Sequence, residues 1–141
     1  SLCRIIYCYI NILLMKDILY PSIVMLVLDF LWLTLFMGPK YKIMIPNIQG
    51  SPLKTNIYYA IIAYILMIIG QQIFVKPLIN SYKDALIYGS LFGIILFGVY
   101  DFTAGAVIKN WDLNLALIDV LWGSLLLTVS SLPFAYLKLK N

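Results

Sequence analysis

Long apolar stretches alternate with short polar connections along the chain, and this pattern predicts membrane-spanning helices. A helix needs about 20 apolar residues to cross the hydrocarbon core of a bilayer, because each residue advances it by about 1.5 Å. Four stretches reach that length, at about residues 18–37, 55–75, 83–108 and 113–136. We therefore expect an all-α fold, a polytopic transmembrane four-helix bundle.

The connections between these stretches contain the residues that commonly end helices. The first connection, residues 38–54, includes Gly38, Pro39, Pro46, Gly50 and Pro52, and we expect it to turn the chain back at the membrane interface. Two glutamines, Gln71 and Gln72, close the second stretch. They are expected to form hydrogen bonds in the headgroup region rather than to line a pore.

Composition supports a membrane protein. Hydrophobic residues make up 63% of the 141 residues and charged residues 11%, whereas soluble domains average about 45–50% and about 25%. This length accommodates one four-helix transmembrane domain, which we assign to residues 15–141. Residues 1–14 are interpreted as an N-terminal extension, because Met15-Lys16-Asp17 resembles an ordinary start just before a span; the alternative is a short signal-like or interfacial segment.

Several residue types are absent or scarce, and this excludes some chemistry within the chain. There is no histidine and no glutamate, so a histidine-based triad or a histidine-ligated zinc or haem site cannot form. Cys3 and Cys8 are interpreted as unreactive thiols in an apolar segment. We expect no metal and no cofactor. Enzymatic activity remains an open question, since no motif of a soluble enzyme is present.

The cations lie at the ends of the spans and form no basic cluster, so we expect a lipid bilayer and no nucleic acid as partner. Both termini are expected on the same side of the membrane. Lysine and arginine counts favour the cytoplasm for that side. The six cations there would be Arg4, Lys16, Lys76, Lys83, Lys138 and Lys140, against four on the other side, Lys40, Lys42, Lys54 and Lys109.

Three aspartates lie inside the apolar stretches without a basic residue beside them: Asp29, Asp101 and Asp119. A carboxylate at the bilayer centre costs about 2.5–3.5 kcal/mol on insertion scales, so it usually faces a bundle interior and marks a functional site. At about 1.5 Å per residue, all three fall in one layer, in the half of the bilayer nearer Lys40 and Lys109. We therefore expect them to form one polar site.

A short repeat surrounds two of these aspartates. Leu28-Asp29-Phe30-Leu31-Trp32 matches Ile118-Asp119-Val120-Leu121-Trp122, with tryptophan three residues after aspartate in both. This spacing predicts that each indole lies beside its own carboxyl on one helical face and donates a hydrogen bond to it. The two helices run in opposite directions, so the match indicates an inverted pair, although coincidence also explains five similar residues.

Small residues provide a second pattern. Ala85, Gly89 and Gly93 are spaced four apart, which favours close helix packing over a groove for substrate. The full packing set is Ala85, Gly89, Gly93, Gly98, Gly105 and Gly123. The full predicted polar site is Asp29, Trp32, Tyr100, Asp101, Thr103, Asp119 and Trp122.

An ordered set of short motifs runs through the same residues, from about Met15 to the end. They are Asp29-x-x-Trp32, Tyr41, Phe74-Val75-x-Pro77, Gly89-x-x-Phe92-Gly93, Tyr100-Asp101-x-Thr103, Trp111 and Asp119-x-x-Trp122-Gly123. Together they resemble a small bacterial membrane family catalogued as domain of unknown function twenty-one seventy-seven. The resemblance implies a four-helix membrane protein in which the aspartates are pattern positions, and it implies no reaction. Ala104 stands where the family pattern has asparagine.

Three functions fit these residues. The first is binding or transport of a cation, proton or small polar solute, with at least one crowded carboxyl holding a proton; in a chain this small it implies a homo-oligomer. The second is a lipid-modifying enzyme or accessory protein acting on fatty-acid chains, with aspartate as general acid or base. The third is a structural role in membrane assembly, in which the acids hold the bundle together.

Overall fold

The computed structural model describes the backbone of residues 2–140 and the side chains of residues 15–140, and the described chain is helical without strands. Its elements, in order, are α1 (Leu2–Trp32), the π-helical turn η1 (Leu33–Met37), α2 (Gly38–Gln49), α3 (Ile57–Gly70), the π-helical turn η2 (Gln71–Val75), the 3₁₀ turn η3 (Lys76–Leu78), α4 (Tyr82–Val107) and α5 (Leu113–Lys140).

Four helical stretches are long and apolar enough to cross a membrane: Met15–Gln49, Ile57–Leu78, Tyr82–Val107 and Leu113–Lys140. The expected all-α polytopic fold is confirmed. Residues 2–14 continue α1 as helix, and their side chains lie outside the described part.

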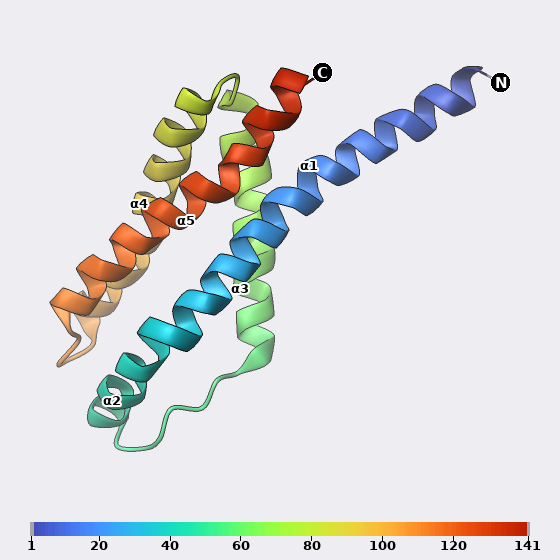
Figure 1. Cartoon of the computed structure of the whole chain (residues 1–141). Coiled ribbons are helices and arrows are strands. Elements are labelled where there is room, and N and C mark those ends of the chain that lie inside the picture. The colour runs from blue at the N-terminus through green and yellow to red at the C-terminus, as the bar shows by residue number, and fades with distance from the viewer. Residues whose placement is uncertain (1, 141) are drawn as a thin grey trace.

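The start of α1 and the end of α5 lie at one end of the bundle, together with the α3–α4 connection (Figure 1). α2 and the α4–α5 connection lie at the opposite end (Figure 1). α4 and α5 form the most extensive contact, and α1 packs on α5. α3 touches α1 only lightly and contacts α4 and α5 mainly through η2. The first half of α3 therefore makes little contact with the other helices.

Glycines set the close approach of α4 to α5. A Cβ added to Gly93 would lie 2.2 Å from the carbonyl oxygen of Gly123, and one added to Gly89 would lie 2.8 Å from the carbonyl oxygen of Leu127. Gly123 is covered in turn by the ring of Phe97. Any side chain at these positions would push the two backbones apart. The close spacing of α4 and α5 therefore depends on glycine at both positions.

The connection at residues 38–54 differs from the sequence-based prediction. Residues 38–49 form α2, which runs on from α1 through Pro39 and Pro46 and ends only at Gly50, whose φ of 72° is left-handed. Pro39 lies in the first turn of α2, where a missing N–H costs little. Glycine and proline therefore did not end the first helix where the pattern predicted.

A π-helical turn precedes a proline at two places in the chain. In η1 the N–H of Gly38 bonds to the carbonyl oxygen of Leu33, and Pro39 follows. In η2 the N–H of Lys76 bonds to the carbonyl oxygen of Gln71, and Pro77 follows. The wider turn shifts the hydrogen-bond register just before a residue that has no N–H to donate. The helix thus continues past each proline for at least part of a turn.

Side chains cap the remaining helix starts. Asn56 accepts a hydrogen bond from the N–H of Tyr58 at the start of α3. Ser81 accepts from the N–H of Asp84, whose carboxylate accepts from the N–H of Asn80 at the start of α4. These caps satisfy backbone donors that have no partner within the helix.

Two buried apolar clusters fill the bundle. The middle cluster contains Met25, Leu126 and Leu127, all fully buried, and Phe92 and Phe97 pack against it. The second cluster lies nearer the end of the bundle that holds the start of α1. It contains Val75, Ile79, Ala85, Phe134 and Ala135. Along α5, Leu126 and Leu127 of the middle cluster lie between Asp119 and the serines, Ser130 and Ser131, that bind Gln71 of η2.

Gln71 of η2 is buried within the bundle. It is 1% exposed, and its amide donates to the hydroxyl oxygens of Ser130 at 2.7 Å and Ser131 at 2.9 Å. Gln72 donates to the backbone oxygen of Asp17 on α1. Both glutamines therefore form hydrogen bonds to other helices, and η2 turns Gln71 inward onto α5.

Candidate functional site

Three carboxyl groups from three helices converge inside the bundle. Asp29 of α1 and Asp119 of α5 are each 7% exposed, and Asp101 of α4 is 1% exposed. The carboxyl of Asp119 faces that of Asp101, with Asp29 also close enough for its charge to act on Asp119. We refer to these three residues as the acidic cluster.

The indoles of the two repeated motifs bind across the bundle. Trp122 of α5 donates through Nε1 to Oδ1 of Asp29 on α1 at 3.0 Å. Trp32 of α1 donates through Nε1 to Oδ1 of Asp119 on α5 at 3.4 Å. The expectation that each tryptophan serves the aspartate of its own helix was wrong. Each motif instead supplies the donor for the other motif's acceptor, so the two helices are joined by a reciprocal pair of hydrogen bonds.

Stacking aligns these indoles. The rings of Trp32 and Trp122 lie 4.5 Å apart between centroids with 5° between their planes, and Phe36 stacks on Trp32 at 4.4 Å. The ammonium group of Lys40 lies 4.7 Å from the centre of the Phe36 ring. The result is an aromatic column along one side of the acidic cluster, with a cation at its outer end.

Asp29 is fully provided with donors. Besides the indole of Trp122, the hydroxyl of Tyr64 on α3 donates to its Oδ2. Each carboxyl oxygen therefore has a donor. This arrangement suits a carboxyl that holds α1, α3 and α5 together.

Asp101 stands in contrast. Both of its carboxyl oxygens are buried, and neither has a hydrogen-bond partner. The indole N–H of Trp111 faces this carboxyl but is also without a partner. Buried polar groups are nearly always paired, so Asp101 differs from Asp29, and the groups that face it are the carboxyl of Asp119 and the indole of Trp111.

No cation neutralises the acidic cluster within the described part of the chain. Among residues 15–140 the ion pair found is that of Lys76 with Asp17, at 2.7 Å, in a different region of the bundle. The same residues contain no group of three or more metal-ligating side chains placed to hold a metal ion.

A pocket of about 480 Å³ leads to two of the carboxyls. It lies between α3 and α4, and Tyr41 of α2 also lines it. Its polar lining consists of Asp29, Tyr41, Tyr64, Tyr100 and Asp119. Its apolar lining consists of Leu33, Ala60, Ala63, Leu66, Met67, Leu96 and Phe97. Because the carboxyls are almost fully buried while Leu66 and Tyr100 are more than half exposed, the acids lie at the deep end. We call this the acidic pocket.

Of the other predicted polar site residues on α4, Tyr100 lies in the acidic pocket and Thr103 does not. Tyr100 lines the acidic pocket and contacts Trp111 edge to face, 6.2 Å between centroids. Thr103 is exposed on α4 and lies outside the acidic pocket.

Gly98 and Gly105 have ordinary space around them: an added Cβ would come no nearer than 4.0 Å and 3.5 Å to another atom, so close packing does not require glycine at either position.

Sequence reasoning missed Tyr64 and gave Tyr41 and Trp111 no role in the site. A signal existed for Tyr64, because it lies seven residues into α3 from Ile57, about 10 Å deep at 1.5 Å per residue. That is the layer assigned to the aspartates. Tyr41 had no such signal, since it was expected in an interfacial turn and reaches the site because α2 is helical.

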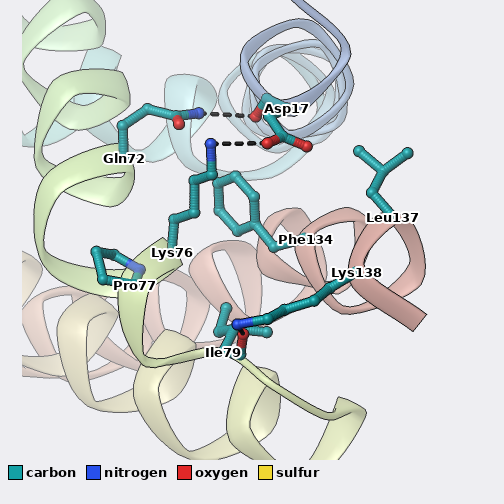
Figure 2. A pocket seen from close by; sticks show the side chains of 8 residues that line it. All are labelled: Asp17, Gln72, Lys76, Pro77, Ile79, Phe134, Leu137 and Lys138. Carbon is teal, nitrogen blue, oxygen red and sulfur yellow. Dashed lines mark hydrogen bonds and ion pairs between the residues drawn. The ribbon is translucent and has the colours of Figure 1, made fainter. Parts of the chain in front are cut away.

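A second pocket, of about 540 Å³, lies at the opposite end of the bundle, where α1, η2, η3 and α5 meet (Figure 2). Lys76 is paired there with Asp17, and the ammonium group of Lys138 donates to the backbone oxygen of Ile79 and to Asn80. Its cations are thus engaged in contacts that join helix ends. These contacts assign the second pocket a structural role.

The fold and the acidic cluster define the class: a polytopic helical membrane protein with buried carboxyls between its spans. The family model described as predicted membrane protein (DUF2177) matches residues 14–136, and the chain belongs to this family. The resemblance drawn from the sequence motifs is confirmed. No curated protein and no solved structure matches the chain.

Proposed function

We propose that the protein is a membrane-embedded binding protein or carrier that holds a proton on the Asp101–Asp119 pair and exchanges it for a cation or small polar solute. The observation that carries this proposal is the buried carboxyl of Asp101, which has no partner and faces a second carboxyl. Two such groups without a nearby cation cannot both be ionised in a low-dielectric interior. A proton or a cationic ligand must balance the pair.

The three aspartates of the acidic cluster differ in hydrogen bonding and in access to the pocket, and this difference supports exchange of a proton for a ligand. Asp29 has a donor on each oxygen and is the fixed member. Asp119 has one long hydrogen bond and lines the acidic pocket, so an arriving ligand can reach it. Asp101 faces Asp119, does not line the acidic pocket and is the proton reservoir in this proposal. Intramembrane acids arranged in this way commonly mark proton and ion pathways.

A structural role is the second candidate, and the reciprocal indole bonds favour it for Asp29. These bonds join α1 and α5 whether or not a ligand binds. They give no account of Asp101, which contributes no hydrogen bond. A structural role therefore accounts for Asp29, whereas proton exchange accounts for the Asp101–Asp119 pair.

Infrared spectroscopy of the protein in nanodiscs tests whether a carboxyl is protonated. The carboxylic-acid C=O band at neutral pH is expected to be present in the wild type and lost in Asp101→Asn. The control is Asp112→Asn, because Asp112 caps α5 outside the acidic cluster and asparagine caps equally well. A spectrum of Asp101→Asn that matches the wild type would refute the proposal.

Exchange is tested by the release of protons into weakly buffered solution when a cation is added. The probes are potassium, tetramethylammonium and dodecyltrimethylammonium, none of which carries a proton of its own. At least one should release protons from the wild type and from Asp112→Asn but not from Asp101→Asn. Absence of release with all three probes would also refute the proposal.

A further inference from the structure

We infer that the ligand of the acidic pocket is a single-chain amphiphile with a cationic ammonium head, which enters sideways from the lipid between α3 and α4. This inference rests on the proposed function and narrows it to a substrate class and a route. It begins with the composition of the pocket wall. Seven apolar side chains and five polar ones line the pocket, and the polar ones include both accessible carboxyls.

The mouth of the acidic pocket faces the surface that a membrane protein presents to lipid. Ala63 and Leu66 of α3 are exposed there, and so is Tyr100 of α4. The first half of α3 has little contact with α4 or α5, so no helix closes this side. The small side chains of Ala60 and Ala63 leave the space that makes the opening. A ligand can therefore reach the carboxyls without crossing the aqueous phase.

The deep end fits a cationic head. Asp29 and Asp119 supply acceptors, and no basic side chain of residues 15–140 forms an ion pair with them. The aromatic rings of Tyr41, Tyr64 and Tyr100 line the same pocket. Carboxylates and aromatic rings together are the surroundings in which ammonium groups bind. The unpartnered carboxyl of Asp101 behind them gives a proton that the arriving positive charge would displace.

The apolar wall fits a hydrocarbon chain. A small hydrated ion would occupy only the polar end and leave the pocket-facing surfaces of Leu33, Leu96 and Phe97 uncovered, whereas an alkyl chain would cover them. A volume of about 480 Å³ lies within the usual range for pockets that bind small molecules with few convergent polar groups. Chain and head thus each have a matching part of the pocket.

Binding to the wild type in nanodiscs of phosphatidylcholine tests this inference, with protein-free nanodiscs as the background for partition. Dodecyltrimethylammonium combines the chain with the positive head. Tetramethylammonium has the head alone, dodecanol the chain alone, and dodecyl sulfate the chain with a negative head. Dodecyltrimethylammonium is expected to bind at least about ten-fold more tightly than each of the others, a difference of about 1.4 kcal/mol. It alone should release protons.

Two matched variants examine the route. Ala63→Leu narrows the mouth and should weaken binding of dodecyltrimethylammonium by about ten-fold, which corresponds to about 1.4 kcal/mol. Ala106→Leu makes the same change at an exposed position of α4 outside the pocket and should bind as the wild type does. Thermal unfolding of both variants shows that the fold is kept.

The outcomes separate this inference from the proposed function. If tetramethylammonium or potassium releases protons as well as the long-chain probe, the amphiphile is wrong and proton exchange stands. Equal binding of dodecanol, or equal effects of Ala63→Leu and Ala106→Leu, also overturns the inference. If no probe releases protons, or if Asp101→Asn keeps the carboxylic-acid band, both proposals fail.

Discussion

The indole rings of Trp32 and Trp122 lie face to face with 5° between their planes, and each donates its N–H to the aspartate of the opposite helix. The contact thus combines ring stacking with two hydrogen bonds, one donated by α1 to α5 and the other by α5 to α1. Since α1 and α5 are antiparallel, the two motifs are related as if by a two-fold axis between the rings. Equal spacing in the two motifs is what allows both bonds to form at once.

The hydrogen bond from Trp122 can be removed while an aromatic ring is kept at that position. Trp122→Phe should lower the free energy of unfolding by about 1–3 kcal/mol, because one oxygen of the buried Asp29 loses its donor. Trp111→Phe is the control, since its Nε1 is buried without a partner and its loss should be neutral or slightly stabilising. Thermal unfolding in micelles, followed by circular dichroism, measures both. Equal destabilisation by the two variants would contradict the reciprocal arrangement.

Asp29 and Asp101 should differ when each is cut back to alanine. Asp29→Ala leaves the hydroxyl of Tyr64 and the indole of Trp122 without an acceptor, whereas Asp101→Ala leaves only the carboxyl of Asp119 without the group that faces it. Both variants create a similar cavity, so the difference isolates the hydrogen bonds. We expect Asp29→Ala to be less stable than Asp101→Ala by about 1–3 kcal/mol in unfolding free energy. The reverse order would argue that Asp101 holds the bundle together.

Gly93 should tolerate no side chain. Gly93→Ala places a methyl group 2.2 Å from the carbonyl oxygen of Gly123, so α4 and α5 must separate. We expect a loss of about 1–3 kcal/mol or more, as for overpacked cores. Gly98→Ala on the same helix meets nothing closer than 4.0 Å and should be neutral or slightly stabilising. The measurement is unfolding of both variants in the same micelle, and equal stabilities would rule out the close contact.

The amide of Gln71 should stabilise the bundle through α5. Gln71→Leu removes the donor to Ser130 and Ser131 and is expected to cost about 1–3 kcal/mol of unfolding free energy. Gln72→Leu loses only the bond to the backbone oxygen of Asp17, in a part-buried position, and should cost less. The same unfolding assay ranks the pair. If Gln72→Leu proved the more damaging, the inward orientation given to Gln71 by η2 would be wrong.

The fold class was predictable because span length and apolar composition are properties of single helices. The course of residues 38–49 was not. Proline ends helices in most contexts, but here Pro39 follows a π-helical turn, after which the helix continues. The sequence around Pro39 does not distinguish such a turn from the end of a helix. The end of the first helix is therefore where the sequence-based prediction failed.

Within the site, the depth of each side chain along its helix was predictable, whereas the neighbour toward which each side chain points was not. The shared depth of Asp29, Asp101 and Asp119 follows from counting residues, and the same count would have included Tyr64. The partner of each indole depends on how α1 and α5 are rotated against each other. That rotation is set by contacts between helices, which spacing of three residues within one helix does not encode.

The apolar layer of Met25, Leu126 and Leu127 is a barrier to charge inside the bundle. Along α5, Asp119 lies on one side of it and Ser130, which binds Gln71, lies on the other. Burying a charge among apolar side chains without a partner costs several kcal/mol. A positive charge held at Asp119 is therefore expected to stay on that side unless these three side chains rearrange.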